Sequence, residues 1–127
     1  MHKNPISSVN RDVVLTKALL NLASFYAIQG KDLACIIGIS EASATRLAKG
    51  KRLISEKTKE GELALLLIRL YRSLNALVGN DAVKAKLWLN SSNRYFSHTT
   101  PMECIKRIEG LIEVVNYLGS IQNNYPF

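Results

Sequence analysis

Apolar residues recur every three or four positions along most of this chain, which is the period of an α-helix. Strict alternation of apolar and polar residues, the pattern of a strand, is scarce. The repeated runs predict helices over 12–27, over two short stretches within 31–49, from between 55 and 61 to 78, and over 81–89, 101–110 and 111–121. The fold class that this pattern predicts is all-α.

The longest predicted helix, which ends at Val78, carries apolar residues on more than one side. A helix of this kind either lies at the centre of a core or is covered by another chain. The pattern therefore favours a dimer, although a monomeric core also accounts for it. In the next helix, 81–89, we expect Val83, Leu87 and Trp88 to be buried.

Local signals set several helix ends. Gln29-Gly30 is expected to end the first helix, and Gly79-Asn80 is expected to end the long one. Thr100-Pro101 begins a capping box, with a threonine N-cap and a proline at the first helical position. That helix is expected to end at Gly110, and a polar tail is expected to follow 121.

The segment KDLACIIGISEASATRLAKG, residues 31–50, has the spacing of a helix-turn-helix. Gly38 stands where the chain must turn, and Ala34, four residues earlier, is small enough for the two helices to approach closely. Ser40 is placed to cap the second helix with its hydroxyl. Two helices joined by a short turn with glycine form a DNA-reading unit, whose second helix lies in the major groove. A purely structural hairpin is the alternative, and DNA binding is favoured.

Polar side chains of the second helix and its exit would contact DNA. The expected DNA-binding residues are Ser40, Glu41, Ser43, Thr45, Arg46, Lys49, Lys51 and Arg52, with Lys57 and Lys59 as further phosphate contacts. Arg46 is the candidate for a bidentate bond to guanine or, failing that, for a phosphate contact. Glu41 is interpreted mainly as an acid that stabilises the helix N-terminus.

Charge agrees with this interpretation. The chain of 127 residues carries a formal net charge of +7. Residues 1–60 hold 10 Lys or Arg against 5 Asp or Glu, a net of +5, whereas 61–127 hold 7 against 5, a net of +2. Most of the positive charge therefore surrounds the hairpin, which agrees with attraction to a phosphate backbone. An ordinary solvated surface is the alternative explanation of this charge.

The sequence gives little support to a metal-binding or enzymatic function. Cys35 and Cys104 are not spaced as a metal site, and we expect both to be buried free thiols in a reducing cytosol. No phosphate-cradling glycine loop or nucleophile elbow is present, and Glu109 and Glu113 are interpreted as surface acids. We expect no catalytic residue, no cofactor and no metal. Without a secretory signal or a run long enough to span a bilayer, the chain is expected to be cytoplasmic and away from membranes.

Three segments are expected: a flexible arm over 1–11, a helix-turn-helix DNA-binding domain over 12–60, and a second helical module over 61–127. The second module resembles the antitoxins of RES–Xre toxin–antitoxin pairs, the Xre/MbcA/ParS family. The resemblance rests on KEGELALLLIRLYRSLNALVGNDAVKAKLWL and TPMECIKRIEGLIEVVNYL. The features that match are Glu62, Arg69 and Arg72 in the leucine-rich helix, Val78-Gly79, Trp88-Leu89 with Asn93, Thr100-Pro101 and Gly110-Leu111. An Xre-like helix-turn-helix in front is the family's usual order, so the resemblance spans roughly 13–121.

The resemblance implies a cytoplasmic, homodimeric, all-α antitoxin, with an N-terminal Xre-like helix-turn-helix bundle and a small toxin-binding module. Its partner would be a RES-domain toxin that acts on NAD, whose active site the antitoxin occludes, and it would bind double-stranded DNA at its own promoter. The implied toxin-binding residues, from the end of the chain, are Leu118, Ser120, Ile121, Gln122, Asn123 and Tyr125. The alternative is a free-standing helix-turn-helix repressor whose C-terminal half only dimerises.

Overall fold

The chain folds into helices joined by short turns, as seen in a computed structural model that describes residues 8–124. The helices are α1 (Ser8–Phe25), α2 (Gly30–Ile37), α3 (Glu41–Ala48), α4 (Lys59–Val78), α5 (Ala82–Leu89), α6 (Pro101–Cys104) and α7 (Ile108–Asn124), with a 3₁₀ turn η1 (Arg94–Phe96). No strand occurs among these residues. The all-α prediction is confirmed.

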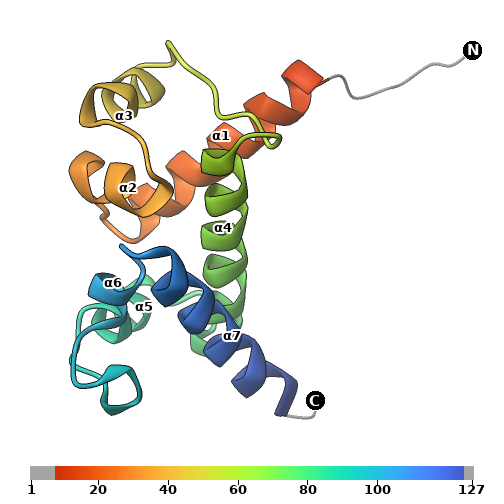
Figure 1. Ribbon diagram of the computed structural model, residues 1–127. Coiled ribbons are helices and arrows are strands. Elements are labelled where there is room, and N and C mark those ends of the chain that lie inside the picture. The colour runs from red at the N-terminus through yellow and green to blue at the C-terminus, as the bar shows by residue number, and fades with distance from the viewer. Residues whose placement is uncertain (1–7, 125–127) are drawn as a thin grey trace, which may run out of the picture.

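Helix α4 is the axis of the molecule. It lies between α1–α3 at one end and α5–α7 at the other, and α7 packs along it (Figure 1). Leu67 and Leu70 on α4, and Leu111 and Val114 on α7, have no exposed surface. The leucine-rich helix is therefore central to the core of the single chain, which is one of the two outcomes that its apolar pattern allowed.

The first helix has different ends from those predicted. It begins at Ser8, not at Asp12, so residues 8–11 of the expected arm are helical, and 1–7 lie outside the described residues. It stops at Phe25, and the chain reverses at Ala27, which adopts a left-handed φ of 56°. Gln29 and Gly30 do not end this helix, because Gln29 is the N-cap of α2.

Gly110 does not end a helix either. Helix α6 stops at Cys104, and Gly110 belongs to the first turns of α7. A Cβ at Gly110 would lie 1.9 Å from the carbonyl oxygen of Cys104, so the glycine permits a close approach of two backbones. The Thr100 cap is confirmed, since its hydroxyl accepts a bond from the Glu103 N–H at 3.1 Å.

Helix α5 faces the core with different residues from those expected. Val83 and Leu87 are 72% and 67% exposed, whereas Ala85 and Leu89 are fully buried. The prediction that Val83 and Leu87 are buried was therefore wrong. Trp88 is half-buried, and its ring stacks on that of Tyr117 with 6.3 Å between centroids.

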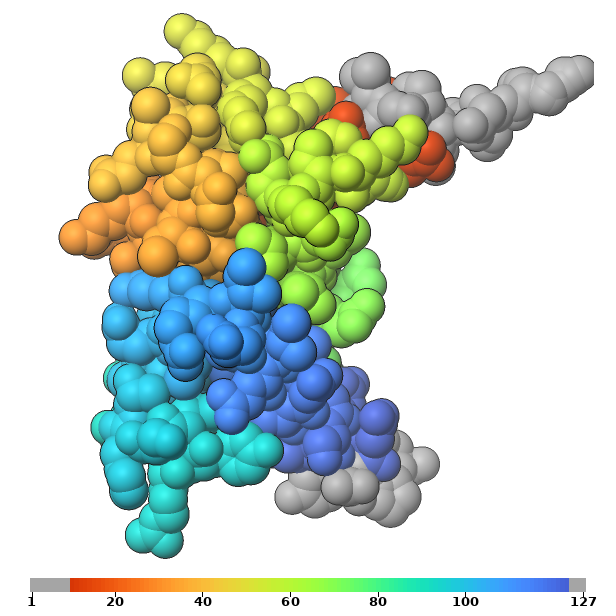
Figure 2. Space-filling model, in the orientation of Figure 1, coloured from red at the N-terminus to blue at the C-terminus, as the bar shows by residue number. Residues whose placement is uncertain are grey.

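The two ends of the molecule are joined by polar contacts as well as by α4. Lys106, between α6 and α7, places its Nζ 3.4 Å from Oδ1 of Asp32 on α2. The Tyr26 hydroxyl donates to Oδ1 of Asn75 at 3.2 Å inside the core. In the space-filling view the surface of α2 rests directly on the start of the C-terminal segment (Figure 2). The predicted division at residue 60 falls in the first turn of α4 and stays a prediction.

Candidate functional site

The hairpin of α2 and α3 is formed as predicted. Gly38 adopts a left-handed φ of 76°, and its N–H and that of Ile39 both donate to the carbonyl of Ala34 at 2.9 Å. Ala34 is 3% exposed, and Leu47 on α3 is fully buried. The turn therefore depends on the conformational freedom of glycine, and the second helix is held against the first by apolar packing.

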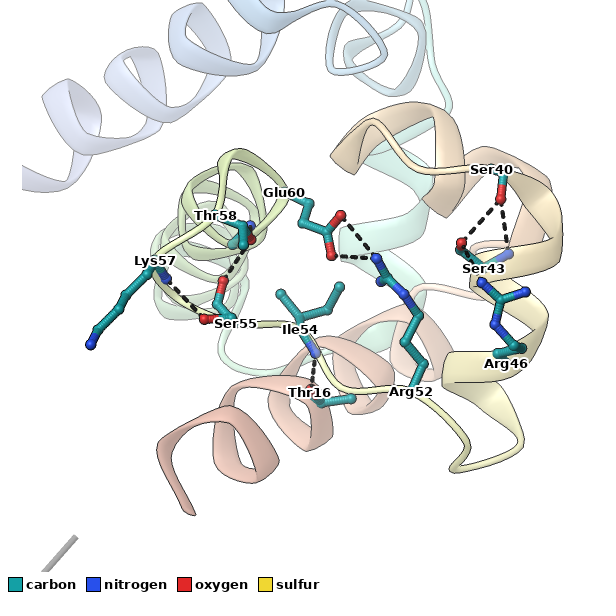
Figure 3. Close-up of polar contacts among 11 residues, drawn as sticks. Thr16, Ser40, Ser43, Arg46, Arg52, Ile54, Ser55, Lys57, Thr58 and Glu60 are labelled. Carbon is teal, nitrogen blue, oxygen red and sulfur yellow. Dashed lines mark hydrogen bonds and ion pairs between the residues drawn. The ribbon is translucent and has the colours of Figure 1, made fainter. Parts of the chain in front are cut away.

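The start of α3 carries a connected set of polar side chains. The Ser40 hydroxyl oxygen accepts a bond from the Ser43 N–H at 3.0 Å, so the predicted N-cap is confirmed. The Ser40 hydroxyl donates to Oγ of Ser43 at 3.0 Å, and Nη2 of Arg46 donates to the same Oγ at 3.1 Å (Figure 3). The exposed guanidinium of Arg46 is thereby held beside the first turn of α3, with other N–H groups free to meet a phosphate or a base.

Further predicted DNA-binding residues surround Arg46. Glu41 lies in the first turn of α3, where a negative charge is stabilised by the helix dipole. The Thr45 hydroxyl donates to the Glu41 carbonyl at 3.1 Å, so its proton is already used within the helix. Lys49 and Lys51 are exposed and form no ion pair with the described residues. This combination gives α3 and its exit a positive, solvent-facing surface.

Arg52 is engaged elsewhere. Its Nη2 lies 2.8 Å and 3.1 Å from the two carboxylate oxygens of Glu60 on α4, and its side chain is 27% exposed. The expected phosphate contact from Arg52 is therefore not supported, because the side chain ties the connector to α4 (Figure 3). Its Nη1 is buried without a hydrogen-bond partner. The neighbouring Ile54 is fully buried, and its N–H donates to Oγ1 of Thr16 at 2.8 Å.

The remaining basic residues of the connector face solvent. Lys57 is exposed, and Lys59 places its Nζ 4.0 Å from Oε1 of Glu62. Leu53 is 42% exposed, whereas its neighbour Ile54 is fully buried. The connector is thus anchored by Ile54 and Arg52, with its lysines outward.

The C-terminal candidate residues fall into three groups. Leu118 is 1% exposed and continues the buried stripe of α7, so its side chain packs in the core and offers little surface to a toxin. Ser120 and Asn123 are exposed, and Ile121 and Gln122 are half-buried on the last turns of α7, which extends to Asn124 in place of the expected polar tail. Tyr125 lies outside the described residues.

Sequence reasoning missed an exposed apolar surface at this end. Val83 and Leu87 project from α5, and Tyr95 is 58% exposed while its ring lies 4.3 Å from that of Tyr117. Helix α5 carries apolar residues on two of its sides, and either side could face the core. Its periodicity alone therefore did not indicate which residues point outward.

Two cysteines differ in environment. Cys104 is buried, and burial raises the pKa of its thiol. Cys35 is exposed, which contradicts the expectation that both are buried, and its thiol donates to the carbonyl oxygen of Lys106 at 3.9 Å. Within residues 8–124 no group of histidine, cysteine or acidic side chains is arranged to hold a metal ion.

Titratable groups are also perturbed where the two ends of the molecule meet. Hydrogen bonding to Glu103 at 2.8 Å raises the pKa of Lys106, and Asp32 adds to the shift. Burial raises the pKa of Tyr26 well above its usual range, and the nearby Tyr71 adds to it. These shifts describe structural contacts, and none of them lies on the α3 surface.

Comparison with known proteins assigns both halves of the chain. Residues 6–69, half of the chain, match the family described as the antitoxin Xre-like helix-turn-helix domain. Residues 73–123 match the family described as the antitoxin Xre/MbcA/ParS C-terminal toxin-binding domain. Both families are regulatory and not enzymatic. No curated protein matches the chain, and none of the helices within residues 8–124 is long and apolar enough to cross a membrane.

Proposed function

Because the chain belongs to the Xre/MbcA/ParS-type antitoxins, we propose that it neutralises a RES-domain toxin that acts on NAD, by occluding the active site of that toxin. It is a type II antitoxin with a DNA-binding helix-turn-helix domain and a toxin-binding C-terminal domain, and it is not an enzyme. The observation that carries the proposal is the toxin-binding family assigned to residues 73–123. We further propose that it acts in the cytoplasm as a homodimer and represses its own promoter.

The end of α7 is the proposed point of contact with the toxin. It extends past the end of α4, away from the rest of the molecule (Figure 1). Its exposed residues, Ser120 and Asn123, and the half-buried Gln122 and Ile121 offer hydrogen-bonding groups beside one apolar side chain. A projecting helix end of this kind fits the entrance of a cleft, as occlusion requires.

The surface of α3 is the proposed DNA interface. Arg46 would contact base edges or a phosphate, and Lys49 and Lys51 would contact phosphates. Ser40, Ser43, Thr45 and Glu41 line the same exposed start of the helix. Since each lysine that neutralises a phosphate releases a counterion, we expect binding to weaken steeply with salt.

Co-expression with the RES-type toxin of a neighbouring reading frame tests the proposed function. We expect growth to be rescued and the two proteins to purify together. Arg46→Ala is the matched control, because it should impair promoter binding and leave rescue intact. A chain truncated after Leu118 should fold but rescue poorly.

The opposite outcomes are also informative. Failure of the full chain to rescue growth or to purify with the toxin contradicts neutralisation. In that case intact promoter binding would favour a free-standing repressor whose C-terminal half only dimerises. Full rescue by the truncated chain places the contact elsewhere, and the exposed Val83, Leu87 and Tyr95 are then the next residues to substitute.

A further inference from the structure

An exposed ridge runs along the first half of α4. Glu62, Leu65 and Arg69 follow one another at intervals of three and four residues, so they lie on one side of the helix, and all three are exposed. Leu65 is 47% exposed although it sits in the middle of the ridge. Packing in the core does not explain why a leucine stands between an acid and a base on an open helix surface.

An apolar groove lies on each side of this ridge. The groove toward α1 has a volume of about 340 Å³ and is lined by Val14, Leu15, Ala18, Leu65, Ile68, Arg69 and Arg72. The groove toward α7 has a volume of about 330 Å³ and is lined by Lys59, Glu62, Leu63, Leu66, Ile108 and Ile112. Val14 and Ile108 are more than 60% exposed. Solvent-exposed apolar side chains gathered on one face mark an interaction surface.

The shape and charge of this face are self-complementary. In a two-fold interface the same patch meets itself, so a ridge beside a groove can fill the groove of its copy. If two α4 helices cross in opposite directions near Leu65, Glu62 of one chain faces the partner's Arg69, and the reverse pair forms by symmetry. Within residues 8–124 Arg69 forms no ion pair, and Glu62 reaches only Lys59, at the limiting distance of 4.0 Å.

We propose that this face, centred on Leu65, is the interface of a homodimer, with reciprocal ion pairs between Glu62 and the partner's Arg69. The proposal rests on the homodimer named above and does not depend on the identity of the toxin. A crossing angle of about 50° makes the helix ends diverge, which separates the like charges of Lys59 and the partner's Arg72 one turn farther out. DNA is a poor occupant, because the face is largely apolar.

A charge swap tests the pairing between chains. The mass of the purified full chain is measured by sedimentation over a range of concentrations, and circular dichroism checks that each variant is helical. Glu62→Arg and Arg69→Glu should each weaken the dimer by at least about tenfold, because each replaces two attractive pairs with two repulsive ones. An equimolar mixture of the two variants should restore the dimer as a heterodimer, in which both pairs are opposite in charge again.

Two further variants separate this face from others. Leu65→Glu should give a monomer, whereas Leu87→Glu, at a leucine on α5 that is even more exposed, should leave the dimer unchanged. A monomeric wild-type chain, an unaltered dimer in Leu65→Glu, or no recovery in the mixture overturns the proposal. If Leu65→Glu keeps the dimer but no longer purifies with the toxin, the toxin occupies this face and the proposal is likewise wrong. Growth rescue is scored separately, so loss of neutralisation is not confused with loss of the dimer.

Discussion

Gly110 and Cys104 lie so close that a single methyl group on the glycine would overlap the carbonyl oxygen of the cysteine. This contact fixes the start of α7 against the end of α6. Between these two helices, Lys106 reaches across to Asp32 on α2. A residue without a side chain is therefore required where α6 leads into α7, next to the contact that joins this end of the molecule to the hairpin.

Gly110→Ala should destabilise the fold by about 1–3 kcal/mol or more, since the obstructing atoms are backbone and cannot rotate away. Gly119→Ala is the matched control on the same helix, because a Cβ there meets no atom within 4 Å. Alanine at that helical site should stabilise by about 0.5–1 kcal/mol. Urea unfolding followed by circular dichroism gives both values. Equal effects from the two substitutions would contradict the close approach.

Arg46→Ala should weaken binding to the cognate promoter by about 1–3 kcal/mol and relax sequence preference if the guanidinium reads a base. If it contacts a phosphate, affinity should fall uniformly across DNA sequences. Fluorescence anisotropy with specific and scrambled DNA, over several salt concentrations, distinguishes the two. Lys84→Ala, an exposed lysine on α5, serves as the control and should change neither quantity. Unchanged affinity and preference in Arg46→Ala would show that α3 is not the reader.

Arg52→Met should behave differently from Arg46→Ala. The ion pair between Arg52 and Glu60 is partly buried, so its loss should lower the free energy of unfolding by about 1 kcal/mol. The salt dependence of DNA binding should stay the same, because Glu60 holds this side chain. A salt slope reduced by about one, with unchanged stability, would restore Arg52 to the DNA interface.

Leu118→Ala should impair neutralisation only through stability. A leucine that is 1% exposed should cost about 2–5 kcal/mol when truncated. Asn123→Arg, on the exposed side of the last turns of α7, should leave the melting temperature nearly unchanged but lower the affinity for the toxin. Calorimetric titration at a temperature where both variants are folded separates the two effects. Full affinity in Asn123→Arg would move the contact away from this helix end.

Stability should decline at alkaline pH. Three groups have a raised pKa in the folded chain: Cys104, Tyr26 and Lys106, whose ordinary values are 9.0, 10.0 and 10.5. The folded state therefore holds these protons more tightly than the unfolded state. The contribution of the three groups to the free energy of unfolding is complete below about pH 9 and is lost as the pH rises further. Urea unfolding across this range measures the loss. Cys104→Ala should remove the earliest part of it, and a flat profile in the wild-type chain would contradict the assigned shifts.

The sequence was informative where structure is local. The hairpin was predictable because Gly38, Ser40 and Ala34 act on neighbours within a few residues, through turn conformation, capping and small size. The leucine-rich α4 was also predictable, since its period is repeated over twenty residues.

Where tertiary contacts decide the role of a residue, local sequence is not sufficient to predict it. A glycine such as Gly110 commonly ends a helix, but here it lies within α7, and glycine is needed because the backbone of Cys104 approaches it closely. Arg52 has the charge of a phosphate contact, but Glu60 lies beside it in the fold. In α5 both Val83 and Ala85 begin plausible apolar stripes, and only the packing of α5 in the fold decides which is buried.

Helix α4 runs without a break through the boundary between the two matched families, 6–69 and 73–123. An α-helix turns by about 100° and rises by about 1.5 Å with each residue. Inserting one residue between 69 and 73 would therefore turn the toxin-binding part against the hairpin by that angle. Chimaeras that exchange the DNA-binding half between antitoxins of this kind must keep the helical phase, because the junction sets how the hairpin is oriented relative to the toxin-binding domain.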